Sequence, residues 1–319
     1  MSSTLFFIAG LILLILAGDF LVRGAVSIAN RFHVPPLIIG LTIISMGTSA
    51  PELFVSLQAA LEGAPGLAVG NAVGSNIANA LVVLGLPALV APIYFTAPGI
   101  RRSALFMIVI SLGFAFIAAD GMISALDGLI FVVALVVYLL YSVLAASKAR
   151  QKKLNGNLNG DTDLEIPDES DTLLKSLMFL AFGFIGLAIG ARLIVDGALG
   201  LAAIWGIGET VIGTTIVAFG TTLPEIAATL AASFRREAGM AIGNVIGSNI
   251  FNLLGILGIT AMLFPLPVVA SLLQFDLWVL LFSSALIGAL ALMRRPIGKL
   301  FGLALTAFYA TYLFMSFTG

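Results

Sequence analysis

Long apolar runs, separated by short stretches rich in charge, proline or glycine, make up almost the whole of this sequence. An α-helix rises about 1.5 Å per residue, so roughly 20 apolar residues cross the hydrocarbon core of a bilayer, which is about 30 Å thick. The pattern therefore predicts an all-α polytopic membrane protein. Ten transmembrane helices are expected near residues 4–22, 35–61, 66–92, 103–119, 126–147, 173–195, 209–234, 239–264, 273–293 and 297–317.

The composition agrees with a membrane protein. Hydrophobic residues make up 60% of the chain, the mean hydropathy is +1.15, and only 10% of residues are charged, whereas a soluble domain carries about a quarter. The chain has no cysteine, which excludes disulfides, thiolate metal sites and cysteine nucleophiles. Its single histidine, His33, excludes a multi-histidine metal site. The N-terminus lacks the basic segment of a cleaved signal peptide, so the first run is expected to remain as a helix.

Lysine and arginine are distributed very unequally between the two ends of the predicted helices. If the N-terminus lies outside, 14 of the 15 Lys and Arg residues fall on the inner side, and only Arg192 falls on the outer side. Cytoplasmic loops carry the excess of positive charge. We therefore expect an integral protein of the cell membrane with both termini outside. The polar segment 148–172 is expected to form a flexible cytoplasmic linker.

An internal repeat relates the two halves of the chain. At an offset of 173 residues, residues 40–89 align with residues 213–262 without a gap, and 22 of the 50 aligned pairs are identical. This indicates duplication of a five-helix unit, with residues 1–147 as the first copy and residues 173–319 as the second. The shared motifs are Gly-Thr-Ser-Ala-Pro-Glu at 47–52 with Gly-Thr-Thr-Leu-Pro-Glu at 220–225, and Gly-Asn-x-x-Gly-Ser-Asn at both 70–76 and 243–249.

Five is an odd number, so the second unit must enter the membrane in the opposite orientation to the first. Inverted repeats are typical of secondary transporters, whose sites lie near the midplane, between the repeats and at broken helices. Helices 2 and 7 are expected to be broken, because each carries a proline-containing hexapeptide. Asp19 and Arg23 recur at the repeat offset as Arg192 and Asp196, with the signs reversed. Each pair is expected to be either an interfacial ion pair or a gate contact.

The proline of each hexapeptide removes a backbone hydrogen bond from its helix. Proline has no N–H, so the carbonyls of Gly47 and Gly220 lose their helical partners. The glycines also ease unwinding, which could turn the carbonyls of Ser45 and Ala218 inward. Freed carbonyls persist inside a membrane only where protein or a water-lined cavity satisfies them. A bound cation is one way to do so.

A glutamate follows each proline in the middle of an apolar run, where a charge is costly and usually marks an ion path. Hydroxyl groups precede each glutamate by three and four residues, and the next helix carries a serine and an asparagine four residues apart. Side chains at these spacings share one helix face. The candidate ligands are Thr48, Ser49, Glu52, Ser75 and Asn79 in the first repeat, and Thr221, Thr222, Glu225, Ser248 and Asn252 in the second.

A set of ligands made only of oxygen suits hard cations such as Ca²⁺ and Na⁺. Two neighbouring buried carboxylates repel each other, and one divalent ion, or two or more monovalent ions or protons, would neutralise them. An exchanger needs a site that binds the divalent ion and the monovalent ions or protons alternately. The paired glycines of each repeat favour close helix packing near the site. Asn71, Asn76, Asn244 and Asn249 are expected either to bond between helices or to contact the site.

In these motifs the chain resembles the calcium/cation antiporter superfamily, particularly the prokaryotic sodium/calcium exchangers, over nearly its full length. The resemblance implies that ions bind between the two broken helices and the two helices that follow, held by the ten side chains above and the carbonyls of Ser45 and Ala218. It implies Ca²⁺ and Na⁺ as transported ions and no cofactor. The implied partners are inorganic cations and the lipid bilayer, with no nucleic acid. It also implies alternating access, in which the first and sixth helices slide across the other eight.

This chain departs from the resemblance at one kind of position. Many sodium/calcium exchangers carry an aspartate in one repeat where this chain has Asn79 or Asn252, so the site has two formal negative charges rather than three. The sequence favours export of Ca²⁺ in exchange for Na⁺. The alternative is a cation/proton or K⁺-linked exchanger that uses the same two glutamates, although the proton/calcium branch typically carries different repeat motifs.

Two other classes of protein fit the sequence less well. An ion channel needs a continuous pore, whereas a pair of inverted broken helices favours alternating access. The chain has no His-Glu-x-x-His and no Gly-x-Ser-x-Gly motif. Two midplane acids could form a carboxyl protease dyad, but their hydroxyl and proline neighbours suit ion binding better. We therefore expect a transporter and not an enzyme.

Overall fold

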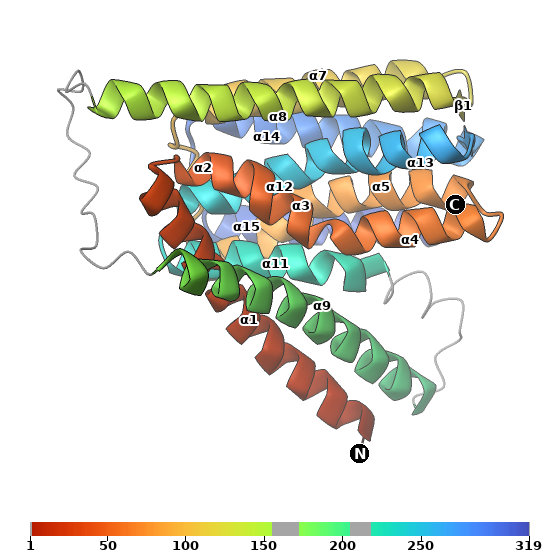
Figure 1. Cartoon of the computed structure of the whole chain (residues 1–319). Helices are drawn as coiled ribbons and strands as arrows, with labels where there is room; N and C mark the ends of the chain where they lie inside the picture. The colour runs from red at the N-terminus through yellow and green to blue at the C-terminus, as the bar shows by residue number, and fades with distance from the viewer. Residues whose placement is uncertain (1, 155–171, 205–217, 319) are drawn as a thin grey trace.

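A computed structural model describes residues 2–154, 172–204 and 218–318, and nearly all of them are helical (Figure 1). The first half contains α1 (Ser2–Phe32), α2 (Pro36–Ile39), the π-helical turn η1 (Gly40–Ile44), α3 (Ser45–Thr48), α4 (Ala50–Leu61), α5 (Gly66–Ala78), the π-helical turn η2 (Asn79–Val83), α6 (Leu84–Val90), α7 (Ile100–Ala118) and α8 (Ala125–Leu154). The second half contains α9 (Leu173–Ile204), α11 (Ala218–Phe234), α12 (Ala238–Phe251), the π-helical turn η4 (Asn252–Ile256), α13 (Leu257–Leu263), the π-helical turn η5 (Leu272–Asp276), α14 (Leu277–Met293) and α15 (Lys299–Thr318).

The described residues include eight helices that are long and apolar enough to cross a membrane. The bent segment from Pro36 to Leu61 makes a ninth span if its two parts are counted together. The seventh predicted span, 209–234, is represented in part by α11, because residues 205–217, where that span was expected to begin, lie outside the described residues. The prediction of a polytopic helical membrane protein is therefore confirmed.

Several helices are longer than the hydrophobic pattern predicted. The first run was expected to end near residue 22, but α1 continues to Phe32. The linker was expected to begin at residue 148, but α8 continues to Leu154, so residues 148–154 are helical. Hydrophobicity marks only the part of a helix that faces lipid or core, and a helix can continue into water. Residues 155–171 of the predicted linker lie outside the described residues.

Two short antiparallel contacts tie together loops from opposite halves of the chain, and the sequence analysis did not predict them. Strand β1 (Met122–Ile123), between α7 and α8, pairs with β2 (Leu266–Pro267), between α13 and η5. At another place, Ile93 and Ile297 form an isolated bridge with two backbone hydrogen bonds. These contacts pair backbone groups that the helices leave free.

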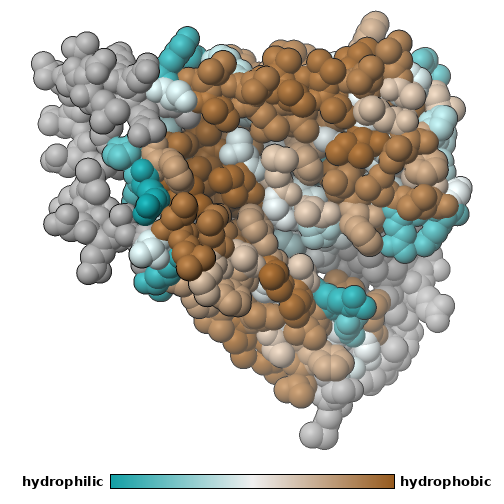
Figure 2. Space-filling model, viewed as in Figure 1, coloured by the Kyte–Doolittle hydropathy of each residue, from teal (hydrophilic) through white to brown (hydrophobic). Residues whose placement is uncertain are grey.

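The surface carries a broad apolar belt. Figure 2 shows brown side chains across the middle of the molecule, with teal patches towards its left and right ends. Exposed residues such as Phe116, Leu140, Phe182 and Trp278 contribute to this surface. An exposed apolar area of this extent belongs in lipid rather than water.

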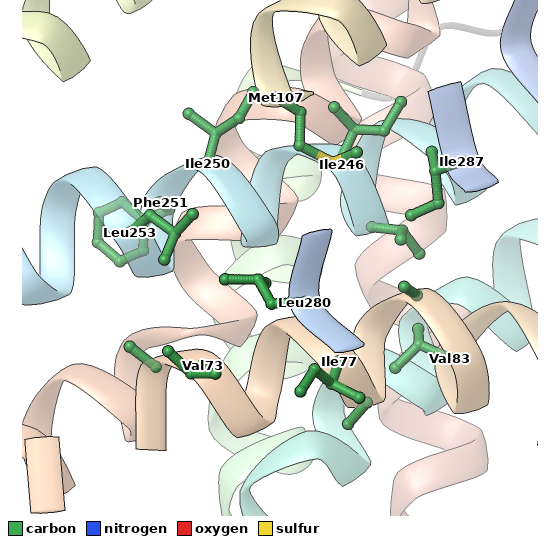
Figure 3. Packing of buried hydrophobic residues seen from close by; sticks show 14 of the residues in the cluster. Val73, Ile77, Val83, Met107, Ile246, Ile250, Phe251, Leu253, Leu280 and Ile287 are labelled. Carbon is green, nitrogen blue, oxygen red and sulfur yellow. The ribbon is translucent and has the colours of Figure 1, made fainter. Parts of the chain in front are cut away.

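The centre of the molecule is built from α5, η2, α12 and η4, with α7 and α14 packed against them. Figure 3 shows Val73 and Ile77 of α5 on one side of Leu280, with Ile250 of α12 and Met107 of α7 on the other. All five side chains are fully or almost fully buried. This packed centre fixes the two helices that carry the second motif of each repeat.

A separate pair of helices, α1 and α9, lies diagonally at the edge of the molecule in Figure 1. The two helices run antiparallel, and glycines bring their backbones together. A Cβ atom at Gly183 would lie 2.7 Å from the backbone of Leu21, and a Cβ atom at Gly10 would lie 2.8 Å from the carbonyl oxygen of Gly190. Ser27 and Ser176 add a hydrogen bond of 2.7 Å between their hydroxyls. Small residues are what allow membrane helices to approach this closely.

Candidate cation-binding site

The first motif lies at a bend in the second predicted span. The segments Pro36–Thr48 and Ala50–Leu61 meet at an angle of 41°, and Ser49 between them has φ −85° and ψ 8°, outside the helical region. The bend follows from Pro51, whose ring and missing N–H disturb the turn before it. The prediction of a broken helix 2 is confirmed at this point, and Glu52 lies in the first turn of the second part, three residues after Ser49.

The second motif lies in a helix that is continuous over the described residues. Helix α11 runs from Ala218 through Pro224 to Phe234, so the break predicted at this proline is not seen. A proline can bend or strain a membrane helix without ending it when neighbouring helices hold the chain in place. The residues immediately before α11 lie outside the described residues.

The two motifs meet at the centre of the molecule. The hydroxyl of Ser49 donates a hydrogen bond of 2.8 Å to Oε1 of Glu225, from the other half of the chain. Glu52 is 1% exposed and Glu225 is completely buried. The two carboxylates that the sequence singled out are therefore both removed from solvent, and the first motif touches the carboxylate of the second directly.

Two asparagines hold the chain just beyond the prolines. Asn71 on α5 donates to the carbonyl of Glu52 (3.2 Å) and to the hydroxyl of Ser56 (3.0 Å). Asn244 on α12 donates in the same way, to the carbonyl of Glu225 (3.4 Å) and to the hydroxyl of Thr229 (3.0 Å). These are interhelical bonds, one of the two roles expected for the asparagines. Sequence analysis missed Ser56 and Thr229, although each follows its glutamate by four residues and they are 173 residues apart.

Asn244 also reaches across to the first motif. The hydroxyl of Thr48 lies 3.3 Å from Oδ1 of Asn244 and 3.3 Å from the carbonyl oxygen of Ser45, and can donate to either. Through Asn244, a hydroxyl of the first motif is connected to the backbone of Glu225 in the second.

Many of the polar atoms in this region are buried without a hydrogen-bond partner. In the described part of the chain these include Oε2 of both glutamates, and they also include the hydroxyl of Ser248 and both polar side-chain atoms of Asn252. Oδ1 of Asn79 is in the same state. Almost all buried polar groups in proteins have partners, so such a concentration of free oxygen atoms needs an explanation. Coordination of a cation would satisfy them.

The π-helical turns η2 and η4 begin at Asn79 and Asn252. Isolated π turns inside helices occur frequently at functional sites, because they change the direction of side chains and free a backbone group. Both asparagines are buried, as is Ser248. They occupy equivalent places in the two halves of the chain.

The remaining candidates differ in how deeply they are buried. Ser45 is buried and Ser75 is nearly so, one turn of α5 before Asn79. Thr222 is buried beside Glu225 along the chain, and Thr221 is partly buried. Ala218 is the first described residue of α11, but nothing is described of its side chain. These placements bring Ser49, Thr48 and Glu225 into one network.

Asn76 and Asn249 belong to a neighbouring contact between α5 and α12. Nδ2 of Asn76 donates to the carbonyl of Asn249 (3.0 Å), and Nδ2 of Asn249 approaches the sulfur of Met107 (3.6 Å). Ser111 and Ser284 meet close by in α7 and α14, with hydroxyl oxygens 3.0 Å apart. The sequence analysis did not select the two serines, although their spacing of 173 residues was a signal that could have found them.

Taken together, the site offers two carboxylates and several hydroxyl, amide and carbonyl oxygens inside an apolar protein. Among the described residues no group of three or more His, Cys, Asp or Glu side chains gathers, so its formal charge comes from Glu52 and Glu225. Oxygen ligands with this charge fit hard cations. The class of protein that these features define is a membrane protein that carries cations.

The chain belongs to the sodium/calcium exchanger protein family, which its sequence matches over residues 2–144 and 175–318. It is 36% identical to the inner membrane protein YrbG of Escherichia coli, over 98% of this chain and 96% of YrbG. It is 32% identical to the sodium/calcium exchanger MaX1 of Methanosarcina acetivorans, over 98% of each chain.

A solved structure of the sodium-calcium exchanger NCX_Mj, from a crystal soaked with neither Na⁺ nor Ca²⁺, has a similar fold. Its TM-score against this chain is 0.83, with 35% sequence identity and 98% of each chain covered. The family resemblance expected from the sequence motifs is therefore confirmed. Family and fold support cation antiport as the activity, and they identify a transport protein rather than an enzyme.

Proposed function

We propose that this protein exports Ca²⁺ in exchange for Na⁺ by alternating access at the central site. The observation that carries this proposal is the burial of Glu52 and Glu225, each with a carboxylate oxygen that has no partner. Two such carboxylates match the charge of one Ca²⁺. The names of the relatives MaX1 and NCX_Mj, both sodium/calcium exchangers, support Na⁺ as the counter-ion.

The proposed ligands are those selected from the motifs. Carboxylates from the two halves supply the charge, and hydroxyl, amide and backbone oxygens complete the coordination, since Ca²⁺ takes six to eight oxygen ligands. The free atoms at Glu52, Asn79 and Asn252 support this assignment. The full set is Ser45 and Ala218 through their carbonyls, with Thr48, Ser49, Glu52, Ser75, Asn79, Thr221, Thr222, Glu225, Ser248 and Asn252 through their side chains.

Two carboxylates also set the charge that the counter-ions must balance. Two Na⁺ ions would neutralise the site as one Ca²⁺ does, so the exchange could proceed without leaving an uncompensated buried charge. Two protons, or a set that includes K⁺, would do the same. Because Asn79 and Asn252 replace any third carboxylate, a cation/proton or K⁺-linked exchanger remains the second candidate.

We further propose that the chain consists of two five-helix units, 1–147 and 173–319, inverted with respect to each other. On a two-fold axis a residue meets its own repeat equivalent. The contacts Asn76 with Asn249 and Ser111 with Ser284 both join residues 173 apart. The seam between α1 and α9 is also two-fold symmetric. Gly24 packs on Leu180, and their repeat equivalents, Gly197 and Phe7, pack on each other. These contacts support ten spans in an inverted repeat.

The orientation in the membrane is proposed from the charges. Figure 1 shows the start of α1 and the end of α15 towards one side, while α8 ends and α9 begins towards the other. The excess of Lys and Arg in the sequence assigns the second side to the cytoplasm. Both termini would then lie outside and the 148–172 segment inside.

The test is uptake of ⁴⁵Ca²⁺ into proteoliposomes loaded with Na⁺, against matched vesicles loaded with K⁺ or choline, with a proton ionophore present throughout. We expect uptake only with an outward Na⁺ gradient. Uptake that follows a K⁺ gradient would favour the K⁺-linked alternative. In a parallel assay without the ionophore, uptake that needs a pH gradient and disappears when the ionophore is added would favour proton exchange. No Ca²⁺ uptake under any gradient would contradict the proposal.

A further inference from the structure

Asn244 has side-chain hydrogen bonds to both motifs of the site. It is 1% exposed, and all its bonding capacity faces the site region. Nδ2 donates to the carbonyl of Glu225 and to Thr229, while Oδ1 lies 3.3 Å from the hydroxyl of Thr48. The two N–H groups of Nδ2 therefore bond to residues of α11, and Oδ1 faces Thr48 of the first motif.

A hydroxyl that binds a cation must use a lone pair of its oxygen, so its hydrogen has to point away from the ion. For Thr48 the acceptors within reach are the carbonyl of Ser45, Oδ1 of Asn244 and the carboxylate of Glu225. The carboxylate of Glu225 is a proposed ligand that supplies charge to the ion, so it is better left to the ion than used as the acceptor of Thr48. The carbonyl of Ser45 is itself a proposed ligand and is best left free for the ion. Groups outside the coordination sphere commonly orient ligands in this way.

We propose that Asn244 is a positioning residue that turns the lone pair of Thr48 towards the ion and couples this ligand to the backbone of Glu225. This proposal rests on the proposed cation site. It adds a connection between the halves of the site, so a shift of Glu225 moves the acceptor of Thr48.

A double-mutant cycle on Ca²⁺ affinity tests the connection. The variants are Thr48→Val, Asn244→Leu and the double variant, measured by Ca²⁺ binding to purified protein in detergent. We expect each single change to weaken binding about tenfold or more, and the double variant to be no weaker than Thr48→Val alone. Asn71→Leu is the matched control, because Asn71 bonds to Glu52 and Ser56 and not to Thr48, and its effect should multiply with that of Thr48→Val.

Multiplicative losses for Thr48→Val and Asn244→Leu would overturn the positioning role, because a purely structural asparagine acts independently of Thr48. Unchanged Ca²⁺ binding in Thr48→Val would instead contradict the proposed site itself. The two failures are therefore distinguishable.

An independent observation concerns ion pairs at the ends of the helices. Asp19 of α1 is bound by two arginines. Nε of Arg23 lies 2.9 Å from Oδ2, and Nε of Arg235, just beyond α11, donates to Oδ1 at 2.7 Å while its Nη2 also contacts that oxygen. The Asp19–Arg235 pair therefore ties the α1/α9 pair to the rest of the molecule.

The repeat equivalents of these residues carry the opposite charges. At the offset of 173, Asp19 corresponds to Arg192 and Arg235 corresponds to Glu62. In the described structure the equivalent pair is not formed. The side chain of Arg192 is 85% exposed and lies 3.9 Å from Asp196, and Glu62 accepts a hydrogen bond from Gln58 instead (2.9 Å).

In an inverted-repeat transporter, the opposite access state arises when the two halves exchange conformations. Each contact that is formed without its repeat equivalent is then broken, and the equivalent contact forms in its place. We infer that Asp19–Arg235 and Glu62–Arg192 are alternating latches, each closed in one of the two access states. This inference rests on the inverted repeat proposed above and on no assignment of the ion.

Local charges around Arg235 do not compete strongly for it. Arg236 follows it, and Glu237 is two residues on and partly buried; burial raises the pKa of the Glu237 carboxyl, while the charge of Arg235 lowers it. Arg236 carries the same charge as Arg235, and among the described residues the ion pair of Arg235 is with Asp19 and not with Glu237. Asp19 is therefore the carboxylate that Arg235 binds in this state.

The absence of cysteine from the sequence makes a cross-linking test direct. One variant carries Asp19→Cys with Arg235→Cys, a second carries Glu62→Cys with Arg192→Cys, and a control carries Asp19→Cys with Glu62→Cys. We expect a bifunctional thiosulfonate reagent that spans the length of an arginine–carboxylate pair to cross-link each of the first two in membranes, with no cross-link in the control, and each cross-link to stop exchange until a reductant is added. A simple oxidant is not used, because it joins only cysteines whose Cα atoms lie within about 7 Å. Failure of the Glu62/Arg192 variant to cross-link would overturn the alternation.

Charge reversal provides a second measurement in case a cysteine pair disturbs folding. Asp19→Arg or Arg235→Asp alone should slow exchange about two- to fivefold, since partly exposed ion pairs are weak, and the two together should restore the rate. Arg235→Gln should speed cross-linking of Glu62→Cys with Arg192→Cys by a similar factor. Loss of rate in the charge-swapped pair equal to that of the single variants would contradict the latch. Cross-linking needs no transported ion, so it tests the latch separately from the proposed exchange.

Discussion

The α1/α9 pair and the central helices α5 and α12 are packed by different means. In α1 and α9, 33% and 39% of the apolar span is buried, against 78% and 89% for the spans that contain α5 and α12. The edge pair meets through glycine and backbone contacts, whereas the central pair buries asparagines and serines. Polar groups are costly inside a membrane protein, so their concentration at the centre supports the proposed ion site. The edge pair, in contrast, packs mainly through small residues.

The largest difference between the two regions is expected when the charge of a central glutamate is removed. Glu225→Gln, and separately Glu52→Gln, should abolish Ca²⁺ transport, with a loss of at least about 100-fold, because loss of a direct ligand exceeds the loss seen for outer-shell groups. The measurement is ⁴⁵Ca²⁺ uptake under a Na⁺ gradient. Asp120→Asn, which changes an exposed carboxylate in a loop, is the control and should keep transport. Uptake retained in either glutamine variant would contradict the site.

How much of this centre could be predicted from sequence follows from its chemistry. The glutamates and their hydroxyls were found because they repeat and because charge in an apolar run is conspicuous. The continuous helix through Pro224 was not predicted, since whether a proline ends a helix depends on neighbours that the sequence does not reveal. The bonds of Asn71 and Asn244 were expected only as one of two roles, and Ser56 and Thr229 were missed because serine and threonine are ordinary residues in membrane helices.

The edge pair can be broken by filling its seam. Gly183→Leu should destabilise the protein by roughly 1–3 kcal/mol, because a Cβ at Gly183 already lies 2.7 Å from the backbone of Leu21. Thermal unfolding in detergent would show a lower midpoint. Gly113→Leu on α7 is the control, since a Cβ there meets no atom within 4 Å. Equal midpoints for the two variants would show that α1 and α9 do not depend on close approach.

A smaller effect is expected from the polar contact in the same seam. Ser27→Ala should lower stability by about 0.5–1 kcal/mol, since it leaves the buried hydroxyl of Ser176 without this partner across the interface. The midpoint of thermal unfolding would fall by about 2 °C. Ser27→Ala with Ser176→Ala should lower stability by a similar amount, because in the single variant the hydroxyl of Ser176 still donates to the carbonyl of Thr172 (3.2 Å) and is not left unsatisfied. A double variant less stable than the sum of the singles would contradict this reasoning.

The fold itself was largely accessible from hydrophobicity, but its helix ends were not. α1 and α8 extend past their apolar runs, since helical propensity and hydrogen bonding continue where hydrophobicity stops. The short pairing of β1 with β2 also had no sequence signal, because each strand is only two residues long. Contacts of this kind depend on which loops the packed helices bring together.

The π-helical turns at Asn79 and Asn252 have a consequence for the history of the chain. They cover residues 79–83 and 252–256, a separation of 173 residues, while the turn at 272–276 has no π-helical equivalent at 99–103. One ancestral half that already carried the turn accounts for both copies. The irregular turn beside the site would then be older than the two-fold architecture around it, and the π turn at 272–276 would have arisen after the copies began to diverge.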